Sequence, residues 1–244
     1  MSMFDRASPP ARARGSSASM KRRVILHSPL GEALQFHRLA GREALSQAYA
    51  FDLDLLGSSN AIDPAALLGK PATVVMETES GAPRYLAGLV TRFGLSHEDN
   101  RQAFYKMRLR PWLWLATRRS DFRVFQDQTV PEIVAAVLGR YGYPLEQKLS
   151  RSYRTWTYCV QYREDDFSFV SRLCEHEGIY YYFRHEAEQH VLVFADDITG
   201  SHAPLPGGDM VRYHPHEKAG MTGGLEASER IYEWASSEEV RPGH

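Results

Sequence analysis

The residues best suited to metal chemistry lie between positions 175 and 190. A metal site needs three or four His, Cys, Asp or Glu side chains that converge on one ion. We single out six candidates in this stretch: Glu175, His176, Glu177, His185, Glu186 and His190. Consecutive helical residues point about 100° apart and the spacing is not His-Glu-x-x-His, so we favour a solvated helix end and a polar hairpin loop. The alternative is a metal-dependent hydrolase that uses four of them: His176, Glu177, His185 and His190.

Other signatures of enzymes are weak or absent. Asp165 and Asp166 are adjacent acids, which suits the capping of a helix better than acid–base catalysis. The sequence contains no Gly-x-Ser-x-Gly elbow, no strand-linked Gly-x-Gly-x-x-Gly turn and no Gly-x-x-x-x-Gly-Lys phosphate loop. Arg118, Arg119 and Arg123 could form a basic patch, but a solvated turn is the simpler interpretation. We therefore expect no enzyme activity, no cofactor and no metal.

The composition is that of an ordinary soluble globular protein. The 244 residues include 29 Lys+Arg and 30 Asp+Glu, with 43% hydrophobic and 11% aromatic residues. These values exclude collagen-like, disordered and strongly acidic classes. A net charge of −1 gives no general reason for a nucleic-acid partner. No stretch approaches the ~20 apolar residues of a membrane span, so we expect no stable membrane anchor.

The chain contains two cysteines, Cys159 and Cys174. Two are too few for a disulfide framework, and their separation is not that of a CxxC zinc or redox motif. We expect both to be reduced, buried thiols.

The elements that would position these residues begin with strands. From about Leu34 to Leu115, apolar residues recur at every second position, which predicts an antiparallel barrel or sandwich. Residues 49–55 and 105–110 place apolar side chains on one face and charged side chains on the other. Residues 85–93 are apolar on both faces, which predicts a central strand with a kink at Gly88.

Helical signals follow in the second half of the chain. Residues 129–132 (Thr-Val-Pro-Glu) form a capping box that opens one helix. A second helix begins at Asp165-Asp166 and runs to Gly178. Residues 179–183 and 191–194 predict a hairpin. The fold class is therefore α+β, mainly antiparallel β, with a barrel-like domain and a smaller α+β domain.

These patterns divide the chain into four segments. Residues 1–23 are expected to be a disordered basic tail, and they lack the apolar h-region of a secretory signal peptide. Residues 24–118 form the barrel-like domain and residues 119–200 the α+β domain. Residues 201–244 are rich in Gly, Pro and His and are expected to form a linker.

A specific motif surrounds the second predicted helix. Residues 158–173 read YCVQYREDDFSFVSRL, and residues 177–183 read EGIYYYF. Together they resemble the Vgr (VgrG) family of type VI secretion tip proteins, and the match extends over roughly residues 31–197. The motif residues, which the resemblance makes structural or assembly residues, are Cys159, Val160, Gln161, Tyr162, Asp165, Asp166, Phe167, Phe169, Arg172, Leu173, Glu177, Gly178, Ile179, Tyr180 and Tyr181.

The resemblance implies a fold similar to the tail hub of contractile phages and a mechanical function without catalysis. It implies a homotrimer that caps the tail tube, with an Hcp-like tube protein, baseplate proteins, a tip protein and effectors as partners. Nucleic acid is not among these partners. The hub would assemble in the cytoplasm and leave through the type VI apparatus. Two functions remain as alternatives, the metal-dependent hydrolase and an effector-loading binding module.

The end of the sequence departs from the family pattern. Family members continue past this point into a small barrel and a needle, whereas this sequence stops at His244. We therefore expect a truncated form, an incomplete barrel in residues 24–118, and in residues 201–244 the start of a segment that returns to it. Missing strands would expose an open edge and apolar surface, which predicts weak solubility or association of the isolated chain.

Overall fold

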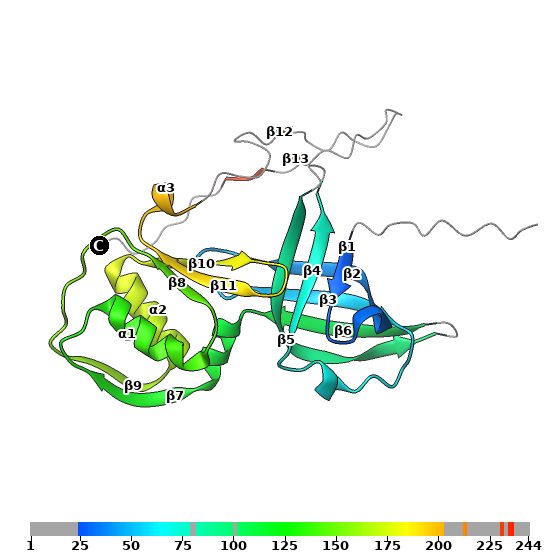
Figure 1. The fold of residues 1–244 in the computed structure, drawn as a ribbon, viewed down its shortest axis with the longest axis horizontal. Coiled ribbons are helices and arrows are strands. Elements are labelled where there is room, and N and C mark those ends of the chain that lie inside the picture. The colour runs from blue at the N-terminus through cyan, green and yellow to red at the C-terminus, as the bar shows by residue number, and fades with distance from the viewer. Residues whose placement is uncertain are drawn as a thin grey trace, which may run out of the picture.

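The computed structural model describes residues 24–78, 82–99, 102–202, 212–213, 230–231 and 234–236. Its largest element is a six-stranded antiparallel sheet with the strand order β1-β4-β5-β6-β3-β2. The strands are β1 (Val24–His27), β2 (Leu34–Arg42), β3 (Ala50–Gly57), β4 (Pro71–Glu77), β5 (Pro83–Glu98) and β6 (Ala103–Arg110). The sheet curls into a half barrel (Figure 1), which confirms the predicted barrel-like antiparallel architecture.

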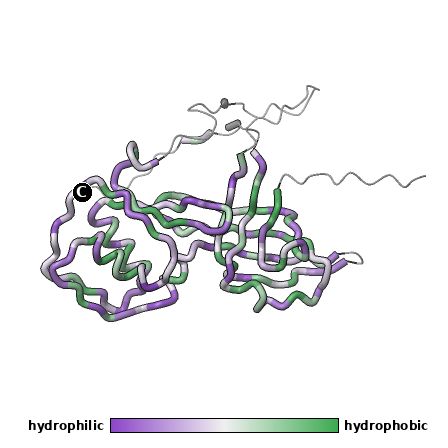
Figure 2. The backbone as a smooth tube through the Cα atoms, viewed as in Figure 1, coloured by the Kyte–Doolittle hydropathy of each residue, from purple (hydrophilic) through white to green (hydrophobic). Residues whose placement is uncertain are grey.

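Apolar and polar side chains alternate along the strands, and this alternation gives the sheet a single apolar side. Hydrophobic and hydrophilic residues alternate along the strands (Figure 2). On β6, Tyr105, Met107 and Leu109 are buried, while Lys106 is exposed and Arg108 is partly exposed. Two short 3-10 helices, η1 (Gly31–Ala33) and η2 (Pro64–Ala66), connect the strands.

β5 is the long central strand, and it changes partner along its length. Its first half pairs with β4 and its second half with β6, with a register shift between Val90 and Arg92. Gly88 lies at this change of partner, where the sequence predicts a kink. A Cβ atom at Gly88 would lie 3.0 Å from the carbonyl oxygen of Arg110. The glycine therefore allows β6 to approach β5 closely.

The sequence predicts strands up to Leu115, and this prediction is wrong for the last residues of that range. Residues Trp112–Arg118 form a 3-10 helix, η3, that begins after Pro111. Proline has a fixed φ and no N–H to donate to a neighbouring strand, so the ladder stops there. Trp112 is fully buried, and its ring stacks on Tyr143 at 5.4 Å.

The second half of the chain forms an α+β unit beside the sheet (Figure 1). A two-stranded ribbon, β7 and β9, lies on one side of two helices, and a three-stranded sheet of order β10-β11-β8 lies on the other. The elements are β7 (Ser120–Phe125), α1 (Val130–Leu138), η4 (Gly139–Tyr141), β8 (Leu145–Lys148), β9 (Cys159–Asp165), α2 (Asp166–Glu177), β10 (Tyr180–His185), β11 (His190–Ala195) and α3 (Ile198–Ser201).

Both predicted helices and the predicted hairpin are confirmed. Thr129 and Glu132 make the capping box of α1, and β10 pairs antiparallel with β11. The parallel pairing of β11 with β8 has no sequence signal, because β8 is a four-residue strand of mixed polarity, Leu-Glu-Gln-Lys.

Parts of the predicted terminal segments lie outside the described residues. The tail 1–23 and most of residues 203–244 are among them. Two short strands are described in the second segment, β12 (Arg212–Tyr213) and β13 (Arg230–Ile231), and they pair in parallel. Of the helices in the described part of the chain, none has the length and apolar character to cross a bilayer.

We predict that Gly88→Ala destabilises the half barrel. The added methyl group would press on the backbone of β6, so we expect the free energy of unfolding to fall by about 1–3 kcal/mol. Gly94→Ala is the matched control, because it lies on the same strand and a Cβ there meets nothing within 4 Å. Urea denaturation followed by circular dichroism measures both. Equal effects of the two substitutions would contradict the close approach.

Candidate functional site

The sequence motif occupies one continuous structural path, β9 to α2 to β10. Two of its residues mark the ends of the helix. Asp165 is the N-cap of α2, and its carboxylate accepts hydrogen bonds from the Ser168 backbone N–H at 2.8 Å and the Ser168 hydroxyl at 3.0 Å. Gly178 ends the helix in the left-handed conformation, with a φ of 68°. Both roles follow from the backbone groups that a helix leaves unbonded at its ends.

Asp166 is the centre of the α+β unit, not a surface contact. Its side chain is fully buried. Arg123 on β7 and Gln161 on β9 donate to one carboxylate oxygen at 2.7 and 2.8 Å. The Tyr141 hydroxyl donates to the other oxygen at 2.8 Å. Burial of the Tyr141 hydroxyl raises its pKa above the ordinary value, and the adjacent carboxylate adds to the rise. One carboxylate thus ties β7, β9, η4 and α2 together.

Arg172 fastens the exposed side of α2 to β9. Its guanidinium donates to the Glu164 carboxylate at 2.7 Å and to the Val160 carbonyl at 2.9 Å. The hydrogen bonds with Glu164 raise the Arg172 pKa. The geometry therefore gives Asp166 and Arg172 bonds within the chain, and neither needs an assembly partner to explain its position.

Most other motif residues are core. The fully or nearly fully buried ones are Cys159, Gln161, Phe169, Leu173, Ile179 and Tyr181. Val160, Phe167, Glu177 and Tyr180 are partly buried. Glu177 accepts a hydrogen bond from the indole N–H of Trp156 at 3.1 Å, and the Tyr180 hydroxyl donates to the Asp197 carbonyl at 3.0 Å.

Both cysteines are free and buried, as the sequence predicts. Burial raises the pKa of the Cys174 thiol to about 12, and it also raises the pKa of Cys159. A raised pKa keeps a thiol protonated and poorly reactive at neutral pH.

Tyr162 is an aromatic motif residue that points to solvent, with 64% of its surface exposed. It pairs across the ribbon with Phe122, which is 62% exposed, and the two rings meet edge to face at 5.4 Å. Val124 on β7 and Tyr158, which directly precedes β9, are also exposed apolar residues of this region. The apolar alternation of Phe122, Val124 and Tyr162 was visible in the sequence, but it does not reveal which face is buried.

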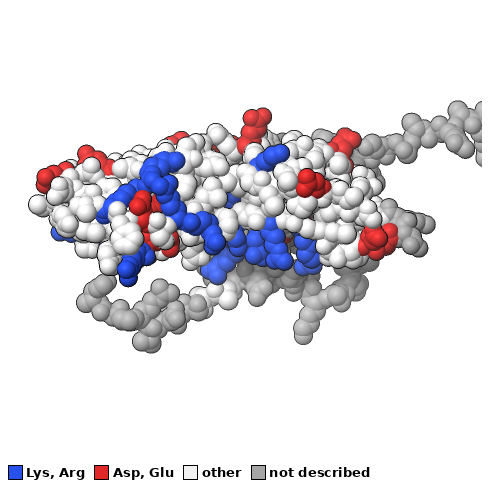
Figure 3. Space-filling view, turned by 90° about the horizontal axis from the view of Figure 1, so that it is seen from below, with Lys and Arg blue, Asp and Glu red and all other residues white. Residues whose placement is uncertain are grey.

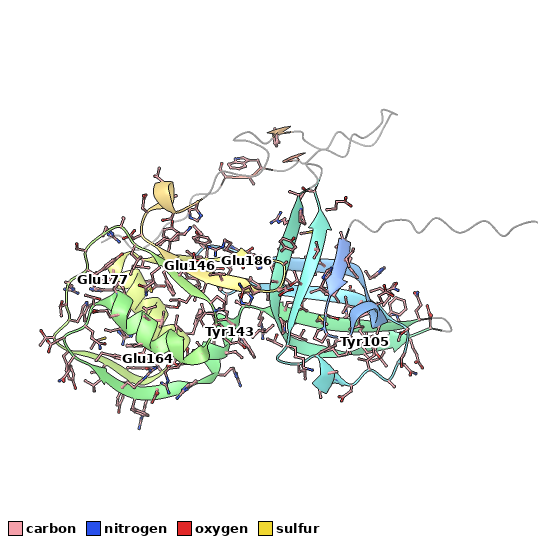
Figure 4. All side chains as sticks on the ribbon, viewed as in Figure 1. Tyr105, Tyr143, Glu146, Glu164, Glu177 and Glu186 are labelled. Carbon is pink, nitrogen blue, oxygen red and sulfur yellow. The ribbon has the colours of Figure 1, made fainter. Side chains whose placement is uncertain are left out.

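The four residues of the metal-site alternative do not come together. His176 and Glu177 lie at the end of α2, where Arg154 contacts the His176 Nε2 atom at 2.7 Å. His185 and His190 lie at the opposite end of the β10–β11 hairpin. Figure 4 shows the same separation between the labelled Glu177 and Glu186. Within the described residues, no three His, Cys, Asp or Glu side chains are placed to hold one ion.

The predicted polar hairpin loop is wrong for His185 and His190, because they form a joint with the half barrel. His190 is 5% exposed, and its Nε2 atom accepts a hydrogen bond from the backbone N–H of Trp112 at 2.8 Å. His185 Nδ1 accepts from the backbone N–H of Ala87 at 3.0 Å, and its Nε2 atom lies 3.1 Å from the Glu43 carboxylate. A histidine in sequence does not reveal which backbone groups it will meet across a domain boundary.

Aromatic packing completes this joint. Tyr49 stacks on Phe51 at 4.7 Å and meets Phe183 edge to face at 5.0 Å. The Tyr49 hydroxyl donates to the Ala87 carbonyl at 2.5 Å. On the other side of the hairpin, the Ser46 N–H donates to the Tyr181 carbonyl at 2.8 Å. The motif strand β10 therefore connects the α+β unit to β3 and β5 of the sheet.

The comparisons with known proteins agree with this architecture. A family model described as phage tail baseplate hub (GPD) matches residues 42–244. The chain is 45% identical over 224 residues to the type VI secretion system spike protein VgrG1c of Pseudomonas aeruginosa, which covers 91% of this chain and 30% of that protein. Identity to VgrG1b of the same organism is 44%, over 93% of this chain and 30% of that protein. The chain thus spans about a third of the length of these relatives.

Solved structures give the same result. One is the E. coli c3393 protein, described as a type VI secretion component with structural similarity to the T4 bacteriophage tail proteins gp27 and gp5. It matches with a TM-score of 0.61 and 30% identity, over 70% of this chain and 51% of that chain. The 43 kDa tail protein of prophage MuSo2 from Shewanella oneidensis matches with a TM-score of 0.52 at 16% identity, over 70% of this chain and 53% of that chain, and so shows the fold alone.

We predict that Asp166→Asn strongly destabilises the α+β unit. The substitution keeps the shape but removes the charge that neutralises Arg123, so we expect a loss of about 3 kcal/mol in the free energy of unfolding. Asp165→Ala is the comparison variant, and it should lose only about 1 kcal/mol, the value of an N-cap. Guanidinium denaturation measures both. A smaller loss for Asp166→Asn than for Asp165→Ala would contradict the central role of Asp166.

We predict that His190 makes stability fall on acidification. Burial, and secondarily the nearby His185, lowers the pKa of His190 to about 3 from its ordinary value of 6.5. Between these values the unfolded chain takes up a proton and the folded chain does not, so stability is fully present above pH 6.5 and is lost as the pH falls. From pH 7 to pH 5 the expected loss is about 2 kcal/mol.

His190→Gln tests this dependence, because glutamine retains an acceptor for the Trp112 N–H but does not titrate. Thermal unfolding at a series of pH values should show a shallower loss for this variant than for the wild type. His27→Gln is the control, because it removes an exposed histidine outside the joint. Parallel curves for wild type and His190→Gln would disprove the assignment.

Proposed function

This chain belongs to the phage tail baseplate hub family, and we propose that it acts as the trimeric hub of a type VI secretion spike. In this role it caps the tail tube and helps to deliver effectors into target cells. The proposal draws on the spike proteins to which the chain is similar, and it concerns a part that spans about a third of their length.

The open half barrel is the observation that carries the proposal. β1 and β2 are the end strands of the sheet, so each has one edge without a partner strand among the described residues. A groove of about 700 Å³ lies between them, and Ile25, Leu26, Leu34 and Phe36 are among the residues that line it. Unpaired strand edges are templates for pairing with another strand. A symmetric ring of hub subunits would use such edges as subunit contacts.

A mechanical role also explains how the motif residues are used. Asp166, Arg172 and Glu177 are hydrogen-bonded within the chain, and Asp165 caps a helix. These bonds stabilise the α+β unit, which a force-bearing part requires. We therefore propose a non-enzymatic protein that needs no cofactor.

The proposed partners follow from the same role. They are two further copies of the chain, an Hcp-like tail-tube protein, baseplate proteins, a tip protein and effectors. Assembly would take place in the cytoplasm, followed by secretion through the type VI apparatus. In this arrangement residues 24–118 act as the hub domain and residues 119–200 as a baseplate-like domain.

We predict that the chain associates through the groove. Light scattering coupled to size exclusion should show trimers or larger species, because the two edges and the exposed Ile25 are otherwise left in water. Ile25→Lys should shift the population to monomers by placing a charge at the edge. Leu68→Lys is the matched control, because Leu68 is also 45% exposed and lies outside the residues that line the groove.

A co-purified tail-tube protein supplies the second readout. Wild type and Leu68→Lys should bind it, and Ile25→Lys should bind more weakly. A compact wild-type monomer that fails to bind the tube protein would contradict the hub role.

A further inference from the structure

A basic cluster covers the outer face of the curled sheet. The cross-strand register places Arg38, Asp54 and Lys106 in one row. Asp52, Arg108 and Arg92 form the next row. Arg110 follows Arg108 by two residues and so shares its face. We call this set the basic face: Arg38, Arg92, Lys106, Arg108 and Arg110. Seen from below, Lys and Arg gather over η3 and the adjoining ends of β5 and β6 (Figure 3).

The two carboxylates on this face already form ion pairs with cations of the same face. Asp54 accepts from the Lys106 ammonium at 2.7 Å. Asp52 accepts two hydrogen bonds from Arg108, at 2.6 and 2.8 Å. The hydrogen bonds from Arg108 lower the pKa of Asp52 against the opposing effect of burial, and the charges of Arg110 and Arg92 lower it further. Asp52 therefore stays ionised, but one carboxylate faces three guanidinium groups.

This excess of positive charge is unfavourable to the isolated chain. Arg92 lies directly opposite Arg108 on the neighbouring strand, and like charges opposite each other destabilise a sheet. Burial lowers the pKa of Arg110, and the charge of Arg108 lowers it further. Asp52 and Asp54 are the acidic residues that the strand register places among these five cations, so the cluster carries an excess of positive charge. A carboxylate from outside would relieve the repulsion.

Trp114 on η3 holds part of the cluster in place. The Arg110 guanidinium lies 4.8 Å from the Trp114 ring, and the Arg118 guanidinium lies 5.9 Å from it. Stacking on an indole orients a guanidinium and leaves its N–H edge available for a bidentate carboxylate. Arg118 is exposed at the end of η3, where the sequence predicts a solvated turn, and its guanidinium also lies beside the Trp114 ring.

We propose that the basic face binds a carboxylate-rich surface of a partner protein. The planar arginine forks on the outer face of the sheet match carboxylates in geometry and charge. Nucleic acid fits less well, because two guanidinium groups already occupy the Trp114 ring that could stack on a base. The face is distinct from the groove between β1 and β2. It extends the proposed hub role by naming the chemistry of one partner surface.

Binding of an acidic peptide and of an oligonucleotide to variants that lack charges of the basic face tests this inference. We would measure binding of a fluorescent oligo-glutamate peptide and of a single-stranded oligonucleotide of equal charge by anisotropy, in low and moderate salt. Arg92→Gln/Arg110→Gln should weaken peptide binding at least about tenfold, because two contacts between guanidinium groups and carboxylates are lost. The two substitutions leave Arg108 and Asp52 intact, and circular dichroism checks that the variant folds.

Arg84→Gln/Lys148→Gln is the matched control. It removes two positive charges from exposed positions on β5 and β8 and should leave peptide binding nearly unchanged. Arg92→Lys/Arg110→Lys keeps the charge but loses the forks, and should bind with intermediate affinity. Equal weakening by the control pair, no peptide binding by the wild type, or tighter and Arg-dependent binding of the oligonucleotide would overturn the proposal. None of these outcomes depends on trimer formation or on the tail-tube protein.

Discussion

The contact between the β10–β11 hairpin and the curled sheet is the constraint on which the arrangement of the molecule depends. It combines directional bonds with aromatic packing: the His190 ring accepts from the backbone of Trp112, and Tyr49 packs against Phe183. Directional bonds to backbone groups fix a register, which apolar packing alone does not. Because β10 continues directly from α2, this register also fixes where the α+β unit lies beside the sheet.

Inside the α+β unit, two buried carboxylates hold strands and helices in fixed relative positions, which hydrophobic packing alone does not ensure. Asp166 binds two strands, a helix turn and a helix start, and Asp196 is similarly buried at the end of β11. Burial would raise the pKa of Asp196, but hydrogen bonds from the backbone of Ser150 and Arg151 and from the Tyr153 hydroxyl lower it well below its usual range. Fully bonded buried charges favour one arrangement over its neighbours.

The sequence was informative where the signal is local. The capping box of α1, the Asp165 cap and the Gly178 end of α2 depend on residues three or four positions apart, and all are confirmed. It was misleading where a partner lies far along the chain. His190 meets Trp112 across 78 residues and is buried, although its neighbours Glu188 and Gln189 are exposed as expected for a loop. Asp166 was predicted as a helix start, but its three partners come from elements that no spacing rule connects.

The surface of the curled sheet differs from the interior of the α+β unit in how its polar groups are paired. In the α+β unit, the buried Asp166 and Gln161 side chains have hydrogen-bond partners within the chain. The sheet, by contrast, has two edges without a partner strand among the described residues and an excess of positive charge on its outer face. Each of these features costs stability in isolation, since edges invite aggregation and like charges repel. A strand that pairs with the edge would remove the first cost, and a carboxylate bound to the arginines would reduce the repulsion between them. Under the proposed hub role, assembly with other proteins would therefore complete the surface of the folded chain.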